Sequence, residues 1–275
     1  MSKIIFSNED LQRIIHLYVN EKRSVSKVAD VYSVNPTVIK RVLKEQCIKI
    51  RNNREIRSLP IDTTFFEVID TPEKAYVLGF MYADGYVTGK RFGIKLKNSD
   101  KDFLIKIRDI LKSEHKVGTY VQDTPYGKVE YCSFNVNNIK MVNDLIKQGV
   151  VYNKSRVLKF PHHLPTNLLS HFIRGYFDGD GSVYKVKQGN TIGISFVGTE
   201  DFLNGILETF KTVIDTKTHV FPYPNKEIYD LKIGGRANVK KIYDYLYRNA
   251  EIFLARKKLV FEDVFGTNRK DVQRL

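Results

Sequence analysis

An internal duplication constrains the fold of this chain more than any other feature of its sequence. Residues 76–85 read Tyr-Val-Leu-Gly-Phe-Met-Tyr-Ala-Asp-Gly, and residues 172–181 read Phe-Ile-Arg-Gly-Tyr-Phe-Asp-Gly-Asp-Gly. Three residues recur 96 positions apart: Gly79 and Gly175, Asp84 and Asp180, Gly85 and Gly181. The similarity continues downstream, where residues 92–96 parallel residues 192–196. A repeat of this length predicts two copies of one subdomain within a single chain.

Each copy shows the same order of predicted elements, which indicates an α+β fold. A helix that carries the motif, at about 72–83 or 167–179, precedes two strands near 86–97 or 182–198. A helix is then expected to begin at Ser99 or Thr199, followed by strands around 117–136 or 217–233 and by one or two helices. Alternating apolar and basic residues in the strands predict a sheet with one face against helices and one polar face open to a ligand.

The motif helices carry small residues where a helix surface normally has larger ones. Gly79 and Ala83 are four residues apart and share one helix face, and Gly175 and Gly179 do the same in the second copy. Glycine inside a helix costs about 1 kcal/mol relative to alanine, so its presence needs a reason. We expect the two helices to pack closely along these small faces.

This packing would bring Asp84 and Asp180 together at the ends of the two helices. Carboxylates at helix C-termini are disfavoured by the helix dipole, and two adjacent carboxylates repel each other. A hard divalent cation, Mg²⁺ above all, would relieve both effects. Gly85 and Gly181, which follow the two acids, are expected to adopt the left-handed conformation of helix caps.

The charge balance points to a nucleic-acid partner. The chain has 45 Lys and Arg residues against 31 Asp and Glu residues, a net charge of +14. Such an excess favours binding to phosphates through counterion release. A bound metal beside a basic, DNA-sized surface is suited to phosphodiester hydrolysis. The polar strand residues expected to contact DNA are Arg91, Lys95, Lys97, Lys128, Lys185, Lys187 and Lys232.

Several classes of protein are excluded. An apolar content of 42% excludes wholesale disorder, and no apolar run has the roughly 18–20 residues of a membrane helix. Two cysteines in 275 residues exclude a secreted disulfide scaffold. With no signal-like start, an intracellular, cytoplasmic protein of bacterial or phage origin is expected, with double-stranded DNA and no membrane as its partner.

The first 50 residues predict a separate module of three short helices. Ser7, Ser24 and Asn35 stand where helix N-caps are preferred, and Pro36 follows Asn35 at the first position of the third helix. This pattern resembles a helix-turn-helix, whose last helix enters the major groove of DNA. The residues expected on its outer face are Thr37, Lys40, Arg41 and Lys44.

The predicted organisation therefore has four parts. Residues 1–50 form the helix-turn-helix module and residues 51–70 a basic linker. Residues 71–160 form the first repeat and residues 161–275 the second.

The two motifs resemble those of the LAGLIDADG homing endonucleases in their single-chain, two-motif form. The resemblance covers about residues 65–265 and includes the lead-in at 65–76. It implies two αββαββα subdomains that form a DNA-binding saddle, and a monomer that makes a double-strand break with short 3′ overhangs at a long asymmetric target. In that family the last acidic residue of each motif binds the catalytic metal, which implies Asp84 and Asp180 as ligands of Mg²⁺. A basic residue late in each repeat lies near the scissile phosphate in that family, which implies Lys154 in the first copy. In the second copy Lys257 is preferred over its neighbour Arg256, because the alignment of the two copies slips by one position.

The second motif departs from the first at two positions. Asp178 stands where the first motif has Tyr82, so symmetry supports no role for it. Arg174 stands at a position that is often small, and we expect that face to be more open to solvent.

Two other functions use the same scaffold. One is a DNA-binding transcription regulator without catalysis, and the other is an RNA-splicing maturase. The pair of clustered acids, Asp84 and Asp180, favours the nuclease over both, and the DNA-binding module disfavours the maturase.

Overall fold

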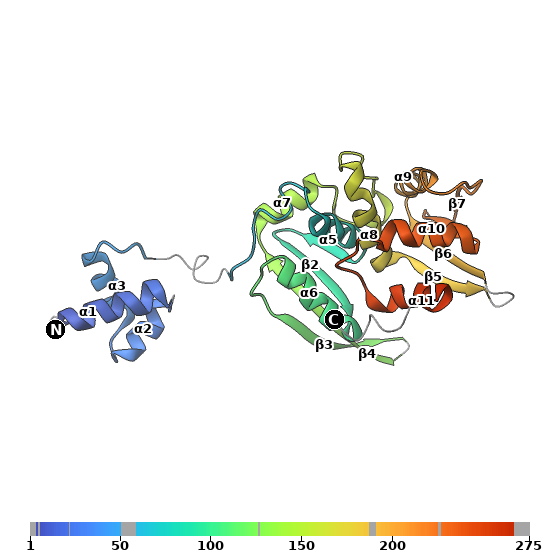
Figure 1. Cartoon of the computed structure of the whole chain (residues 1–275). Helices are drawn as coiled ribbons and strands as arrows, with labels where there is room; N and C mark the ends of the chain where they lie inside the picture. Colours follow the sequence, from blue (N-terminus) through green and yellow to red (C-terminus); the bar gives the residue numbers. More distant parts are fainter. Residues whose placement is uncertain are drawn as a thin grey trace. The chain divides into compact units, whose positions relative to one another are not determined.

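The computed structural model describes residues 4, 6–21, 23–50, 59–125, 127–186, 191–224 and 227–266, which fall into two compact units, Met1–Leu59 and Pro60–Leu275 (Figure 1). Within the described residues, no helix combines the length and the apolar character that crossing a membrane requires. Lys187 and residues 51–58 of the expected basic linker lie outside the described residues.

The first unit is a small helical module with the expected caps. Its helices are α1 (Asn8–Ile15), continued by the π-helical turn His16–Asn20, then α2 (Val25–Val31) and α3 (Pro36–Glu45). Ser7 Oγ accepts a hydrogen bond from Asp10 N at 3.1 Å, and Ser7 N donates in return to the Asp10 carboxylate. Asn35 Oδ1 accepts from Thr37 N at 2.9 Å. The module has its own apolar core, which includes Ile14, Val28, Ala29, Ile39 and Leu43.

The second unit contains the duplicated subdomains. The first copy comprises α5 (Pro72–Ala83), β1 (Gly85–Thr88), β2 (Arg91–Lys97), α6 (Lys101–Ile110), β3 (Val117–Thr124), β4 (Gly127–Asn137) and α7 (Ile139–Lys147). The second comprises α8 (Leu169–Asp180), β5 (Ser182–Val186), β6 (Thr191–Gly198), α9 (Glu200–Lys211), β7 (Val220–Pro222), β8 (Tyr229–Gly234), α10 (Arg236–Tyr247) and α11 (Ala255–Phe265). Short 3₁₀ turns span Asn98–Asp100, Lys154–Arg156 and Thr166–Leu168.

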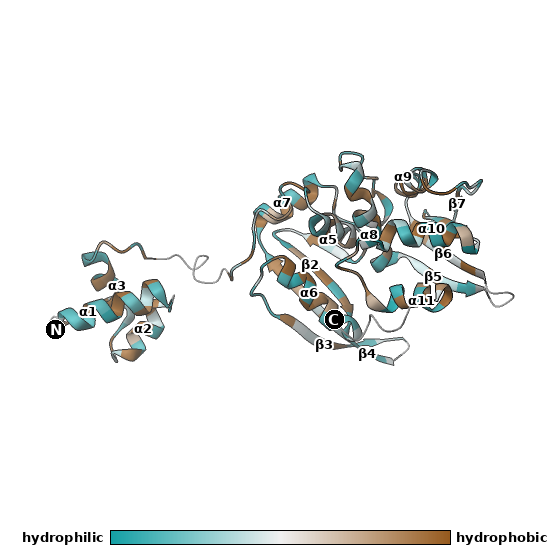
Figure 2. Cartoon of the chain, in the orientation of Figure 1, coloured by the Kyte–Doolittle hydropathy of each residue, from teal (hydrophilic) through white to brown (hydrophobic). Residues whose placement is uncertain are grey.

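The two sheets have the same topology, which confirms the α+β fold built from a duplicated subdomain. Their antiparallel strands run in the orders β1-β2-β4-β3 and β5-β6-β8-β7. In β2, Ile94 and Leu96 are buried while Lys97 is exposed, as alternation predicts. Apolar residues run along β2 and the neighbouring α6 in Figure 2. One continuous core joins both copies, so the second unit folds as one body.

Helices α5 and α8 lie side by side between the two sheets (Figure 1). A Cβ added to Gly79 would overlap the backbone carbonyl of Phe172, and one added to Gly175 would overlap that of Tyr76. A Cβ on Gly179 would overlap the Cβ of Ala83. Backbone therefore meets backbone along this contact, and the glycines make that approach possible.

The expected left-handed caps at Gly85 and Gly181 are wrong. Gly181 has φ −75° and ψ 161°, and Gly85 has no positive φ. Close packing requires glycine here instead. A Cβ on Gly85 would lie 2.6 Å from Met81 Cα, and one on Gly181 would lie 2.7 Å from Phe177 O.

One of the two expected helix starts is also wrong. Thr199 caps α9, since its Oγ1 accepts from Phe202 N at 3.3 Å. Ser99 instead lies inside the 3₁₀ turn Asn98–Asp100, and α6 begins at Lys101 without a side-chain cap. The first copy therefore enters its helix by a tighter turn than the second.

We predict that Gly175→Ala destabilises the second unit by about 3 kcal/mol or more, because the new methyl group meets an immobile backbone carbonyl in a packed core. This loss outweighs the gain in helix propensity. Chemical denaturation of the full chain measures the change. Gly118→Ala is the control, because nothing lies within 4 Å of its added Cβ. Equal stability of the two variants would contradict the backbone contact.

Candidate active site

The parallel packing of α5 and α8 brings Asp84 and Asp180 to the same end of the helix pair. A Cβ added to Gly79 would contact Phe172 and Tyr176, and one added to Gly179 would contact Ala83. The two helices therefore run in the same direction. Asp84 is the C-cap of α5, and Asp180 is the last residue of α8. A Cβ on Gly179 would lie 3.2 Å from Asp84 Oδ2. The first carboxylate thus reaches the residue that directly precedes the second.

Within the part of the chain that the structure describes, the two carboxylates lack direct partners. Neither Asp84 nor Asp180 accepts a side-chain hydrogen bond or forms an ion pair within the described part of the chain. Burial and the neighbouring Asp180 raise the pKa of Asp84 to about 6, although Lys257 and Lys154 oppose the shift. The surrounding protein also raises the pKa of Asp180, even though Asp180 keeps exposed surface. The fold therefore provides neither acid with a hydrogen-bond donor among the described residues, and Asp84 is the less exposed of the two.

Two lysines lie beside the acids and bind the backbone at the helix ends. Lys154 Nζ donates to Ala83 O at 2.5 Å. The buried Lys257 Nζ donates to the carbonyls of Phe177, Gly179 and Gly181 at 2.6, 3.0 and 2.6 Å. Burial lowers the pKa of both amines, that of Lys257 to about 8. Cations at these carbonyls are favourable because helix C-termini carry negative partial charge.

An open hollow of about 520 Å³ adjoins Asp84. It is lined by Asp84, Lys95, Leu96, Lys97, Ser99, Asp100, Tyr131, Gly179 and Arg256. Lys95 Nζ lies 4.1 Å from the centre of the Tyr131 ring and donates to Gln122 Oε1 at 2.7 Å. The hollow therefore offers space beside the carboxylate and a rim of basic side chains suited to an anion.

Asp178 has a structural environment. Its carboxylate is fully buried and accepts hydrogen bonds from Tyr76 Oη, Tyr247 Oη and Leu254 N at 2.7, 2.9 and 2.8 Å. Burial raises its pKa despite these bonds. Because Tyr76 belongs to the first copy, Asp178 ties the two copies together.

The expected solvent-open face at Arg174 is wrong. Arg174 is only 1% exposed. Its guanidinium donates to the carbonyls of Ile252 and Leu246 at 3.0 and 2.7 Å and lies 3.1 Å from His171 Nδ1. One carbonyl from the last turn of α10 and one from the loop that follows it accept from the guanidinium, so the buried side chain itself fills this position.

The basic strand residues differ in how free they are. Arg91, Lys97 and Lys128 are exposed on the first sheet and form no ion pair among the described residues, although Arg91 Nε donates to Asn137 Oδ1 at 3.1 Å. On the second sheet, Lys185 pairs with Asp263, and Lys232 pairs with Asp230 at 2.7 Å. The first sheet therefore offers more unengaged positive charge than the described part of the second.

On α3, three of the four expected outward residues are exposed: Thr37, Lys40 and Lys44. Arg41 is half-buried, and its Nη2 donates to Ile4 O at 3.0 Å. It holds the start of the module instead of pointing freely outward.

Sequence reasoning missed Asp100 and Tyr131 in the hollow. Arg256, the alternative to its neighbour Lys257, also lines the hollow. The carbonyl partners distinguish Lys257 from Arg256. Lys154 binds the carbonyl of Ala83, and Lys257 binds that of the equivalent Gly179. Arg256 is therefore an additional cation of the second copy. Arg256 of the second copy pairs with Asp100 of the first, with 3.1 Å between Nη2 and Oδ2. No local sequence pattern encodes this ion pair.

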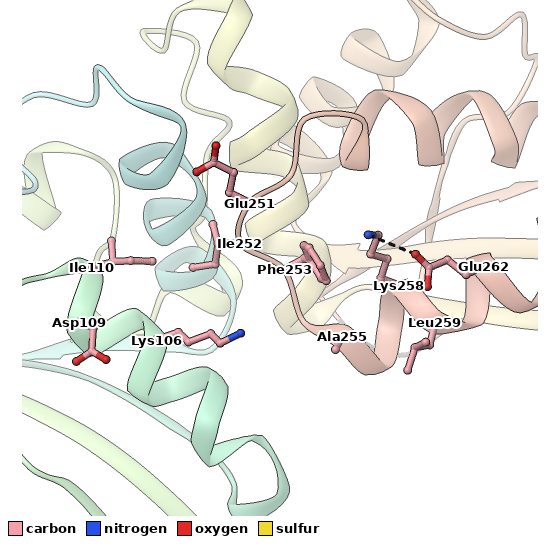
Figure 3. A pocket seen from close by; sticks show the side chains of 10 residues that line it. All are labelled: Lys106, Asp109, Ile110, Glu251, Ile252, Phe253, Ala255, Lys258, Leu259 and Glu262. Atoms are coloured by element: carbon pink, nitrogen blue, oxygen red, sulfur yellow. Dashed lines mark ion pairs between the residues drawn. The ribbon is translucent and has the colours of Figure 1, made fainter. Parts of the chain in front are cut away.

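A second cleft of about 470 Å³ lies between α6 and the segment around α11 (Figure 3). It contains the ion pair between Lys258 and Glu262, 3.3 Å apart. Lys258 Nζ also lies 4.2 Å from the centre of the Phe253 ring. None of its lining residues contributes to the hollow at Asp84.

The donor set at the helix ends suits Mg²⁺. No cluster of three or more His, Cys, Asp or Glu side chains that could hold a metal occurs among the described residues. Mg²⁺ does not need one, because it typically binds through one or two carboxylates and completes its shell with water and phosphate. The unpartnered carboxylates of Asp84 and Asp180 fit this requirement.

Comparison with known proteins gives a consistent picture of the fold. A family model described as "LAGLIDADG-like domain" matches residues 71–162 and 167–247. The structure of the homing endonuclease I-WcaI bound to its DNA recognition sequence is similar, with a TM-score of 0.52 and 11% identity over 79% of this chain and 97% of that one.

Two further structures have lower TM-scores, and one sequence relative matches a smaller share of this chain. The I-LtrWI LAGLIDADG homing endonuclease bound to target DNA has a TM-score of 0.46 at 14% identity, over 74% of this chain and 95% of that one. Full-length DUF199/WhiA from Thermatoga maritima has a TM-score of 0.45 at 13% identity, over 77% of this chain and 68% of that one. "Probable translation initiation factor IF-2" of Methanocaldococcus jannaschii is 26% identical over 60% of this chain, and the match spans only 14% of that protein.

The raised pKa of Asp84 predicts a pH-dependent stability. Its folded-state pKa, about 6, exceeds the ordinary value of 3.8, so its contribution is complete below pH 3.8 and is lost as the pH rises through 6. The Asp84→Asn variant has no carboxylate to ionise at this position, so it avoids this loss of stability. We expect the metal-free variant to exceed the wild type in free energy of unfolding by about 1–3 kcal/mol at pH 8 and to match it near pH 4.

Urea titrations at both pH values measure this difference, with the exposed Asp102→Asn as control. A difference between wild type and Asp84→Asn that is independent of pH would show that Asp84 is not destabilised by ionisation.

Proposed function

The chain belongs to the LAGLIDADG-like domain family, and from this premise we propose that it is a DNA endonuclease that hydrolyses one phosphodiester bond in each strand of a long asymmetric target. The observation that carries the proposal is the pair of unpartnered carboxylates, Asp84 and Asp180, at the ends of two packed helices. A protein that only binds DNA gains nothing from carboxylates held together at a cost in stability. Their retention supports catalysis over a regulatory role.

Asp84 and Asp180 would hold Mg²⁺ by one carboxylate oxygen or more each. When bound, a divalent metal lowers the pKa of water and offsets charge on the phosphate. The carboxylates lie on helix ends fixed by backbone contact, so they are preorganised for this task.

Lys154 and Lys257 would supply positive charge near the scissile phosphates in different ways. Lys257 directs its ammonium at three carbonyls, which uses all its donors, so it acts through charge alone. Lys154 makes one such bond among the described residues and keeps donors for a phosphate oxygen or a water. Burial fixes both amines, so little order is lost when substrate binds.

The surrounding surfaces would give affinity and sequence preference. The basic residues of the two sheets would contact phosphates and bases, and the exposed residues of α3 would add a second contact region. Linking the two units raises the effective concentration of the second contact. Because one chain carries both copies, a monomer suffices for both strands.

We predict that Asp84→Asn and Asp180→Asn each lower cleavage roughly 100-fold or more while binding is retained. The duplex is obtained by selecting cleaved sequences from a randomised library in Mg²⁺, and binding and cleavage are then measured separately. Asp102→Asn is the control for loss of an acid. Full double-strand cleavage by either single variant would place the metal site elsewhere.

The helical module predicts a change in salt dependence. In the full chain, Lys40→Ala with Lys44→Ala should weaken binding and reduce the slope of log affinity against log salt by up to about 2, since each phosphate contact contributes about 0.9. Lys27→Ala, on the exposed surface of α2, should leave the slope unchanged. A double variant with the wild-type slope would show that α3 does not touch DNA.

A further inference from the structure

The two halves of the active site are equivalent in backbone but not in side chains. Ala83 and Gly179 occupy equivalent positions, and their carbonyls accept from Lys154 and Lys257 respectively. This equivalence makes Asn153 the counterpart of Arg256, since each directly precedes its lysine. The second copy therefore adds a guanidinium where the first has an exposed amide side chain.

Arg256 crosses from the second copy to the first. Its Nε lies 3.2 Å from both carboxylate oxygens of Asp100, and its Nη2 lies 3.1 Å from Asp100 Oδ2. The Asp100 side chain is 10% exposed, whereas that of Arg256 is 56% exposed. One edge of the guanidinium is thus held by a largely buried carboxylate, and Nη1 on the other edge has no partner among the described residues.

Arg256 and Asp100 both line the hollow that contains Asp84 and Gly179. Lys257, which follows Arg256 in the chain, donates to three backbone carbonyls. Arg256 is therefore the cation of this segment that a ligand in the hollow can reach. A planar guanidinium held along one edge presents its remaining N–H groups in a fixed direction, a geometry well suited to phosphate oxygens.

We propose that Arg256, oriented by Asp100, binds a phosphate of only one DNA strand on the Asp84 side of the site and thereby makes the two strands cut at unequal rates. The other strand meets Asn153, which carries no charge. The inference rests on the proposed nuclease function and adds to it a residue that discriminates between strands.

The test follows both strands of one cognate duplex, each carrying its own label, under single-turnover conditions. Arg256→Gln should slow cleavage of one strand roughly 10-fold or more and change the other less than about 2-fold. Arg256→Lys should restore part of the rate, because it returns the charge without the planar fork. Asp100→Asn should slow the same strand by a smaller factor, because the guanidinium remains but loses its orientation.

The matched control is Arg156→Gln. Arg156 also pairs across the two copies, with Glu227 at 3.2 Å, but both side chains are more than 70% exposed, and neither lines the hollow. It should leave the ratio of the two strand rates unchanged. Thermal unfolding of all variants is recorded in parallel.

Two outcomes overturn the inference while the nuclease function stands. One is equal slowing of both strands by Arg256→Gln. The other is a loss of thermal stability in Arg256→Gln and Asp100→Asn with an unchanged strand ratio, which would make the pair a structural link only. A wild-type protein that cuts neither strand would overturn the nuclease function and this inference with it.

Discussion

The close contact between α5 and α8 is the interaction on which the rest of the structure depends. Glycines at positions 79 and 175 let the backbones of the two helices touch, so the relative position of the two subdomains is set by main-chain atoms. Such a contact cannot adjust by changing side-chain rotamers. It fixes the distance between the helix ends and hence the separation of the two acids. A site that must hold one geometry benefits from this stiffness.

The chemistry at these ends is a balance of unfavourable terms. Two acids sit where the helix dipoles oppose them, and burial raises the pKa of both. Lys154 and Lys257 lie nearby, and burial lowers the pKa of both amines. The lysines reduce the repulsion without contacting the carboxylates, since their ammonium groups bind backbone carbonyls instead. The carboxylates therefore remain available, and a divalent cation is the ligand that their unsatisfied charge favours.

Duplication gave the molecule two similar halves, and a single chain allowed them to diverge. Asp178 and Arg174 belong only to the second motif, and both are buried at the junction of the copies. Arg256 likewise places a guanidinium in one half only, since Asn153 is its counterpart. A symmetric dimer could not hold these differences, because each substitution would appear on both sides. Such divergence is consistent with the asymmetric duplex target of the proposed function.

Local patterns in the sequence determined the elements of this fold. The repeat predicted two matching subdomains, alternation predicted the sheet faces, and Ser7, Ser24, Asn35 and Thr199 marked helix starts, because caps and strand alternation depend on neighbours in the chain. The small residues of the motif helices also predicted that these helices would pack.

Tertiary structure decided what depends on distant segments. Gly85 and Gly181 are an exception, because their requirement is local: an added Cβ would overlap Met81 or Phe177, four residues earlier in the chain, and neither glycine has a left-handed backbone. Arg174 and Lys257 donate to carbonyls, Asp178 accepts from two tyrosine hydroxyls and a backbone N–H, and Arg256 pairs with an acid. All of these partners lie roughly 70 to 160 residues away in the chain. Spacing along the chain cannot encode such contacts, because they exist only once the two copies have met.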